Sequence, residues 1–408
     1  MPLASTWSVA LFGIDGVPVE IEADISGGVP GVHLIGLPDA ALRESKDRVR
    51  AAVRNSGEAW PQRQVSIAMS PAALPKGGAS YDLALACCVL AAAKLVPHAE
   101  LAGTVLLGEL ALDGRLRGVR GVLPALLAAR RAGLCRAVVP VAVLREAALV
   151  ADVEVLGAKN LAEILGWLRG EAALAGKPDV TTELDTQPGL DLVDVVGQPE
   201  ARWALEVAAA GGHHLLLKGP PGTGKTMLAQ RLTGLLPPLT RDESVEVTAV
   251  NSVAGTLRPD APLVTNPPFV APHHTTSVAA LIGGGSGFAK PGAVSKAHRG
   301  VLFLDEPRNA SPPATNRGQL STFPLVRDSG GQLILLAPVS GWAARRPLPH
   351  VLEAASYGEL FALALADESV PCDRREHQHR SCRVLRVTHR SNAIDRSDFC
   401  ALAVSAAP

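Results

Sequence analysis

A glycine-rich stretch in the middle of the chain has the residue types and spacing of a phosphate-binding loop, Gly219-x-x-x-x-Gly224-Lys225-Thr226. Its glycines let the backbone curl so that successive N–H groups face a phosphate. Lys225 can reach the β- and γ-phosphates of a nucleotide, and the Thr226 hydroxyl can ligate Mg²⁺. The stretch therefore predicts a site for ATP and Mg²⁺. The predicted contacts come from the loop and the residue after it: Gly219, Pro220, Pro221, Gly222, Thr223, Gly224, Lys225, Thr226 and Met227.

A second segment, Gly300-Val-Leu-Phe-Leu-Asp-Glu306, ends an apolar run with two carboxylates. Its four apolar residues predict a buried parallel strand. At the carboxyl end of that strand, Asp305 would hold Mg²⁺ through water and Glu306 would polarise the attacking water. An apolar run that ends in Asp-Glu is common by itself, and the glycine loop before it makes the signal more specific. Lys225, Asp305 and Glu306 are thus the predicted catalytic residues, with Thr226 and Asp305 on the metal.

Both segments need a strand and a helix to position them. An apolar strand is predicted over 215–218, before the loop, and a helix over 227–236, after it. Strand, loop and helix in this order are the context that the loop requires, which argues against a chance glycine cluster. The helix N-terminus adds partial positive charge where the phosphates would lie.

The N-terminal part of the chain alternates apolar segments with glycine-rich turns, and it mixes strands with helices. This mixture predicts an α/β fold class. Strands are predicted over 8–12, 17–25, 32–36, 64–70, 104–107 and 137–140, and helices over 39–55, 80–93 and 122–132. Four regions are expected: a first domain over 1–170, a linker over 171–189, a nucleotide-binding core over 190–306 and a divergent region over 307–408.

Composition limits the function classes. Lys plus Arg and Asp plus Glu balance at 39 each, so net charge alone does not indicate a polyanionic partner, although a local basic surface stays possible. The longest apolar runs are too short to cross a bilayer, and no signal peptide is evident, so we expect a cytoplasmic protein. The six cysteines form no disulfide framework, and Cys87, Cys88 and Cys135 are expected in the core.

Several segments together resemble one family. They are Gly36-Leu-Pro-Asp-Ala-Ala-Leu-Arg-Glu-Ser-Lys, Leu74-Pro-Lys-Gly-Gly-Ala-Ser-Tyr-Asp, Leu107-Gly-Glu-Leu-Ala-Leu-Asp-Gly-Arg-Leu and Ala297-His-Arg-Gly-Val-Leu-Phe-Leu-Asp-Glu. These segments resemble the magnesium-chelatase-like AAA+ ATPases of the ComM/YifB family. The resemblance implies an N-terminal domain like the second domain of ribosomal protein S5, which Lon protease shares, followed by a P-loop AAA+ domain. It also implies a ring-shaped, hexameric helicase-type motor that migrates branches in DNA during transformation or recombination.

The resemblance also implies roles for residues outside the glycine loop. The turn formed by Val195, Val196 and Gly197 would pack on the adenine. An insert carrying His273, His274 and Lys290 would face the pore of the ring and contact DNA phosphates, with a structural hairpin cap as the alternative. Zinc at His273, His274 and His298 is disfavoured, because adjacent ligands and a distant third make a poor tetrahedral set.

Kinship with Lon raises peptidase activity as a rival function. Ser80 falls on the position of Lon's nucleophile, but Leu123 stands where the resemblance places the lysine base. Leucine cannot accept a proton, so the dyad is broken, unless Lys76 replaces the base in space. Ser80 is therefore predicted to be a turn or helix N-cap residue.

After Glu306 the family pattern stops, and two explanations stay open: an unusual lid or a shifted reading frame. The run 332–337 could be a remnant of the family's sensor strand. In the tail, Cys372, His377, His379 and Cys382 could bind zinc, or the arginines around them could bind nucleic acid. Since no sensor group or arginine finger is identifiable, hydrolysis is open. The alternatives to a DNA motor are a metal-insertion ATPase subunit and a non-hydrolysing nucleotide-binding remnant.

Overall fold

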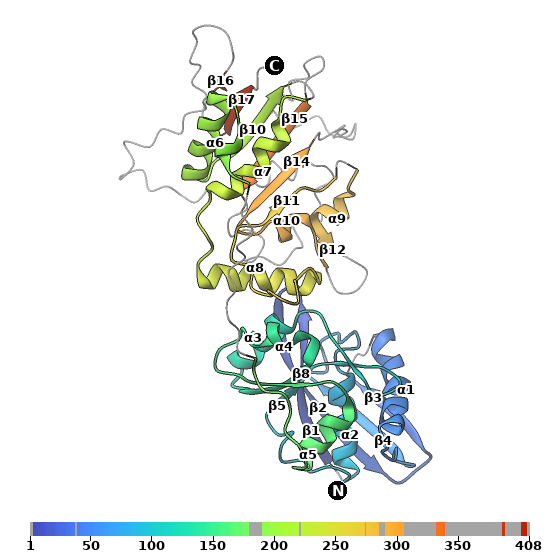
Figure 1. The fold of residues 1–408 in the computed structure, drawn as a ribbon. Coiled ribbons are helices and arrows are strands. Elements are labelled where there is room, and N and C mark those ends of the chain that lie inside the picture. The colour runs from blue at the N-terminus through green and yellow to red at the C-terminus, as the bar shows by residue number, and fades with distance from the viewer. Residues whose placement is uncertain are drawn as a thin grey trace, which may run out of the picture. The chain divides into compact units, whose positions relative to one another are not determined.

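The computed structural model describes residues 3–36, 39–178, 190–219, 222–273, 275–284 and 290–305, and the backbone of three strands at 332–338, 386–387 and 401–405. It divides into two compact units (Figure 1). The first contains residues 3–178 together with Thr248–Val264, and the second contains most of the other described residues. Across the described ranges, none of the helices has the length and apolar character needed to span a bilayer.

A seven-stranded sheet in the order β3-β4-β2-β1-β5-β8-β9 forms the centre of the first unit. β1 and β2 form a long antiparallel hairpin, and β4 is antiparallel to β2, whereas the other neighbours are parallel. Alternate residues of β2 are buried, as expected for a strand with one face in the core. The strands are β1 (Leu3–Phe12), β2 (Asp15–Ser26), β3 (Gly31–Ile35), β4 (Gln64–Ser70), β5 (Thr104–Leu106), β8 (Arg136–Pro140) and β9 (Glu154–Ala158).

Helices pack on this sheet, and one of them is buried on all sides. All eleven residues of α2 (Asp82–Ala92) are buried, because it packs between α1 and the hairpin of β1 and β2 (Figure 1). The side chain of Asp39 starts α1 by accepting the Leu42 N–H at 2.7 Å. The other elements of the unit are α1 (Ala40–Asn55), β6 (Glu109–Leu110), β7 (Leu116–Arg117), α3 (Val122–Arg131), the 3-10 turn η1 (Val141–Val143), α4 (Leu144–Ala147) and α5 (Leu161–Leu168).

The predicted α/β fold of this part is confirmed, although some details differ. Helix α5 was not predicted, although Asn160 caps it by accepting the Glu163 N–H at 2.9 Å. Ser80 lies in a turn, which is one of its two predicted positions, and the N-cap position of α2 belongs to Tyr81. Cys87 and Cys88 are buried as expected, but Cys135 is exposed. The expectation of a core position for Cys135 was wrong, because it lies in the loop just before β8.

The second unit holds a six-stranded sheet in the order β11-β14-β15-β10-β17-β16. Helices α6 and α7 pack against it through a core that includes Leu205, Leu215, Leu228 and Phe303. The strands are β10 (His214–Gly219), β11 (Phe269–Val270), β14 (Val301–Asp305), β15 (Gln332–Pro338), β16 (Arg386–Val387) and β17 (Ala401–Ser405). The helical elements are the 3-10 turn η2 (Leu192–Asp194), α6 (Pro199–Gly211) and α7 (Lys225–Leu235).

Between α7 and β14 the chain forms a longer helix and several short elements. Helix α8 runs over Arg241–Ala254, and by contacts its residues from Thr248 on belong to the first unit. The short elements are α9 (Val278–Ile282), β12 (Gly283–Gly284), β13 (Lys290–Pro291) and α10 (Ala293–Lys296). β12 and β13 pair with each other as a two-stranded sheet.

The strand considered as a sensor remnant, β15, lies between β10 and β14 and is antiparallel to both. β10 and β14 therefore run in the same direction, one strand apart. The predictions made for Glu306, for the reading frame after it, and for Cys372, His377, His379 and Cys382 fall outside the described residues.

Candidate nucleotide-binding site

The glycine loop joins β10 to α7, as the sequence predicts. Gly222 and Gly224 have φ angles of +86° and +79°, in the left-handed region that favours glycine. A Cβ on Gly222 would meet nothing within 4 Å, so this position requires glycine for backbone conformation and not for space. Pro220 and Pro221 lie outside the described residues, and Gly219 is the last residue of β10.

Helix α7 begins at Lys225, directly behind the loop. Gly224 occupies the N-cap position and provides no side chain to cap the first turn, and a helix N-terminus favours an anion. Lys225 is only 4% exposed, and its Nζ lies 3.4 Å from the Thr223 Oγ1. Burying an ammonium group is costly unless anions or acceptors face it. Thr226, in contrast, is exposed in the first turn of α7.

Strand register places Asp305 at the same edge of the sheet as the loop. Ile334 of β15 pairs with Leu217 on one side and with Asp305 on the other. Because β10 and β14 run in the same direction, their carboxyl ends meet at this edge, two strand spacings or about 10 Å apart. This is the edge at which ligands bind in open α/β sheets. The backbone of Asp305 thus lies at the same edge of the sheet as the end of β10, which leads into the glycine loop.

The turn predicted to receive the base is split between core and surface. Val195 is 2% exposed and packs in the core of the unit, whereas Val196 is 94% exposed. Gly197 has a φ of +75°, and the next residue, Gln198, is also left-handed, with φ 52° and ψ 50°. An almost fully exposed valine beside a tight turn offers an apolar surface for a base, while the side chain of Val195 is committed to the core.

Two side chains tie this turn to the glycine loop and its helix. Arg231 of α7 donates from Nε to the Asp191 carbonyl at 2.8 Å and from a terminal nitrogen to the Met227 carbonyl at 3.0 Å. The Nε2 of Gln198 donates to the Thr223 carbonyl at 3.1 Å. Sequence reasoning missed both residues. The only available signals were the Gly197-Gln198 pair before a helix and a lone arginine on the predicted helix.

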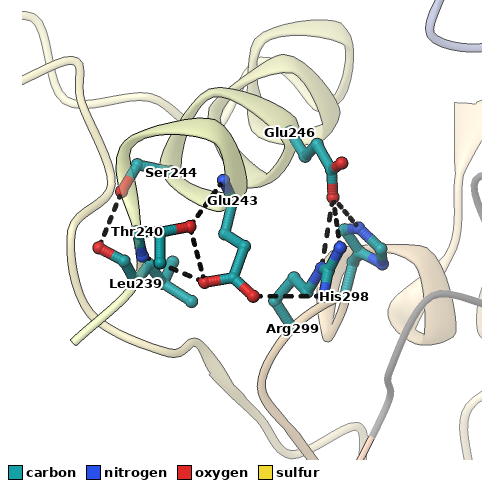
Figure 2. Close-up of polar contacts among 7 residues, drawn as sticks. All are labelled: Leu239, Thr240, Glu243, Ser244, Glu246, His298 and Arg299. Carbon is teal, nitrogen blue, oxygen red and sulfur yellow. Dashed lines mark hydrogen bonds and ion pairs between the residues drawn. The ribbon is translucent and has the colours of Figure 1, made fainter. Parts of the chain in front are cut away.

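A charged cluster holds the chain just before β14 (Figure 2). The Nε2 of His298 lies 3.1 Å from an oxygen of Glu246, and Arg299 bonds both Glu246 and Glu243 at 3.1 Å. Arg299 has a φ of +60°, so the turn is left-handed at a residue that is not glycine. The cluster thereby fixes the entry to β14 against α8.

The same cluster sets the electrostatics of α8. Backbone and hydroxyl hydrogen bonds from Thr240 lower the pKa of Glu243, as in a helix capping box. Burial raises the pKa of Glu246, but the bonds from His298 and Arg299 outweigh it and leave the pKa below its ordinary value. Both carboxylates therefore stay ionised at neutral pH and hold Arg299.

The histidines considered for zinc do not meet in the described residues. The Nδ1 of His273 bonds the Thr275 hydroxyl at 2.8 Å, and His298 is engaged by Glu246. His274 lies outside the described residues. Among the residues that the structure describes, no group of three or more His, Cys, Asp or Glu could hold a metal ion. Lys290, predicted to contact DNA, is exposed.

The rival peptidase site also lacks its base. Lys76 is fully buried, and its Nζ donates to the carbonyls of Gly36 at 3.3 Å, Leu74 at 2.9 Å and Pro71. All three ammonium hydrogens are thereby used, so Lys76 is not placed to activate Ser80. Leu123 is fully buried as well, and its N–H donates to Glu146 at 2.8 Å.

Comparison with known proteins agrees with this geometry. Residues 191–316 match the family described as magnesium chelatase, subunit ChlI, and residues 21–143 match the family described as subunit ChlI of Mg-chelatase. The competence protein ComM of Haemophilus influenzae is 41% identical over 319 residues, which cover 75% of this chain and 60% of that protein. The chain belongs to the magnesium-chelatase-like ComM/YifB family.

Other relatives give the same picture of the family. An uncharacterized protein of Mycobacterium tuberculosis (strain H37Rv) is 62% identical over 308 residues, covering 75% of this chain and 61% of the relative. This member of the ComM/YifB family thus spans about three fifths of the length of these two relatives. A Lon protease of Mycolicibacterium smegmatis is 33% identical over 140 residues, covering 32% of this chain and 18% of the protease. The predicted kinship of the N-terminal domain with Lon is therefore confirmed.

Proposed function

We propose that this chain binds ATP with Mg²⁺ at the glycine loop and works as a ring-forming, hexameric motor on branched DNA. The observation that carries the nucleotide part is the junction of β10 and α7, with left-handed glycines at 222 and 224 and a buried Lys225 at the first position of the helix. Such a junction directs backbone N–H groups and an ammonium group toward the same anion.

In the proposed site each residue has one role. The loop N–H groups and Lys225 hold the β- and γ-phosphates, and Thr226 ligates Mg²⁺. Asp305 orients the metal through water from the end of β14, and Glu306 directs the attacking water. Val196 and Gly197 receive the adenine. Mg²⁺ supplies neutralisation of the phosphate charge that develops during transfer.

The DNA part of the proposal rests on the family. A relative bears the name competence protein ComM, and the family's implied role is branch migration in transformation or recombination. The exposed Lys290 is available for phosphate contacts, which steer without reading sequence.

The test is ATP turnover by the full chain with and without a four-way DNA junction, in the presence of Mg²⁺. Lys225→Ala should abolish ATP binding, whereas Lys159→Ala, which removes an exposed lysine of the first unit, should not change it. Turnover that rises with junction DNA supports the motor. A wild-type chain that binds no ATP would refute the proposal altogether.

A metal-insertion ATPase subunit is the second candidate, because both family descriptions name magnesium chelatase. It predicts turnover that is indifferent to DNA. ATP binding without turnover under any condition would instead indicate a non-hydrolysing member. The same measurement therefore separates the three functions.

A further inference from the structure

Two consecutive residues of the base-binding turn adopt left-handed backbone angles, and the second of them is not a glycine. Gln198 has φ 52° and ψ 50°, after Gly197 at φ +75°. A left-handed residue other than glycine carries a free-energy cost. The cost is higher here because Pro199 follows, and a residue before proline favours extended angles. Strain of this kind persists only where the surroundings fix the residue.

The side chain of Gln198 shows what fixes it. Its Nε2 donates to the carbonyl of Thr223, 25 residues further along the chain, at 3.1 Å. The same nitrogen lies 3.4 Å from where a Cβ on Gly224 would be, so it packs directly against the glycine loop. The Oε1 atom is buried and has no hydrogen-bond partner among the described residues. Gln198 is therefore held against the loop by a single directional bond.

Arg231 contacts the segment that leads to the turn, but not its tip. It donates to the Asp191 carbonyl, and a terminal nitrogen lies 4.0 Å from a carboxylate oxygen of Asp194. The tip of the turn, where Val196 and Gly197 are exposed to a base, is tied to the phosphate loop by the Gln198 side chain.

We propose that Gln198 is a positioning residue that couples the base-binding turn to the phosphate-binding loop, so that base and phosphates bind cooperatively. The proposal rests on the proposed ATP binding at this site. In this proposal the strained backbone at residue 198 serves ligand binding, because its left-handed angles direct the side-chain amide toward the Thr223 carbonyl.

Two substitutions separate this role from a structural one. Gln198→Gly removes the link but relieves the left-handed strain, so thermal stability should stay equal or rise. Gln198→Glu keeps the size but replaces the donor by a carboxylate that faces the Thr223 carbonyl. Gln230→Glu, on the exposed side of α7, is the matched control for that change.

The measurement is the affinity of the full chain for MgATP and for magnesium tripolyphosphate, which fills only the phosphate part of the site. Loss of one hydrogen bond of about 0.5–1.5 kcal/mol should weaken ATP binding about 2- to 12-fold in Gln198→Gly, at undiminished stability. The ratio of ATP affinity to tripolyphosphate affinity should fall in Gln198→Gly and stay constant in Gln230→Glu.

Three results would overturn the proposal. If both Gln198 variants bind ATP as tightly as the wild type, the hydrogen bond from Gln198 to Thr223 does not contribute to ATP binding. If ATP and tripolyphosphate weaken by the same factor, Gln198 shapes the loop without coupling it to the base. If the folded wild type binds no ATP, the proposed function fails, and this inference fails with it. The first two results, in contrast, overturn only this inference and leave the proposed function standing.

Discussion

Replacing Arg48 by methionine should destabilise the first unit strongly at neutral pH, because it deprives a buried carboxylate of its partner. Asp82 is fully buried, and its oxygens accept from the Arg48 Nε at 2.6 Å and from a terminal nitrogen at 3.1 Å. Breaking a buried ion pair from one side costs about 3–5 kcal/mol. The Arg48 side chain is 23% exposed, so about 2–4 kcal/mol is expected at pH 7.

The penalty should depend on pH in a defined direction. Burial raises the pKa of Asp82 above its ordinary 3.8, although hydrogen bonds from Arg48 and Ser45 partly offset it. Where the folded pKa exceeds the unfolded one, the folded form binds more protons, so stability falls as pH rises from the unfolded pKa through the folded one. Without Arg48 the folded pKa of Asp82 rises further. The cost of Arg48→Met should therefore be smaller at pH 5 than at pH 7.

Hydrogen exchange of peptides from α2 in a urea series is the suitable assay, since the two units need not unfold together. Lys46→Met removes an exposed positive charge from the same helix and should change stability by less than about 0.5 kcal/mol. A variant combining Arg48→Met with Asp82→Leu should cost less than the two single changes together. A cost below about 1 kcal/mol for Arg48→Met at pH 7, or strict additivity, would refute the reasoning.

Three further outcomes are expected. Glu146→Ala should lower the free energy of unfolding by about 1–3 kcal/mol or more, because the Leu123 N–H loses its acceptor, while Glu146→Gln should lower it little. Hydrogen exchange of the α3 amides measures this change. Burial raises the Glu146 pKa above 4.5, so wild-type stability falls as pH rises above that value, and Glu146→Gln should abolish this slope. Gly300→Ala should lower the free energy of unfolding by about 1–3 kcal/mol, because the new Cβ would lie 2.6 Å from the Pro268 Cδ. Hydrogen exchange of the β14 amides measures this change, and unchanged exchange would contradict the prediction. Neither the wild type nor Ser80→Ala should cleave an unfolded protein with ATP on a gel, and serine-dependent cleavage would contradict the broken dyad.

The parts of the site that the sequence predicts are those that local chemistry determines. A strand over 215–218 and a helix over 227–236 agree with β10 and α7 within two residues at each end. The glycine positions follow from backbone angles that other residues rarely adopt, so their spacing alone reveals the loop. The strand before Asp305 is likewise visible as an uninterrupted apolar run.

What the sequence does not reveal are contacts between residues far apart in the chain. Gln198 meets Thr223 across 25 positions, and Glu246 meets Arg299 across 53. Neither pair has a spacing rule, because tertiary packing and not local periodicity brings its members together. The burial of Val195 beside the exposed Val196 shows the same limit, since one turn supplies both the core and the candidate ligand surface.

The direction of β15 in the sheet of the second unit bears differently on the proposed ATP binding and on ATP turnover. The neighbours of β15, β10 and β14, end at the edge with the glycine loop and Asp305, but β15 is antiparallel to both and begins there. The resemblance implies a sensor strand that ends at a polar group, whereas β15 begins at this edge, with the backbone of Gln332 level with Gly219. The proposed MgATP site uses the loop, Lys225 and the end of β14, and it uses no residue of β15. Turnover would need a polar group from another part of the protein to contact the γ-phosphate. Substituting Lys225 therefore tests ATP binding, and the measurement with the DNA junction tests turnover separately.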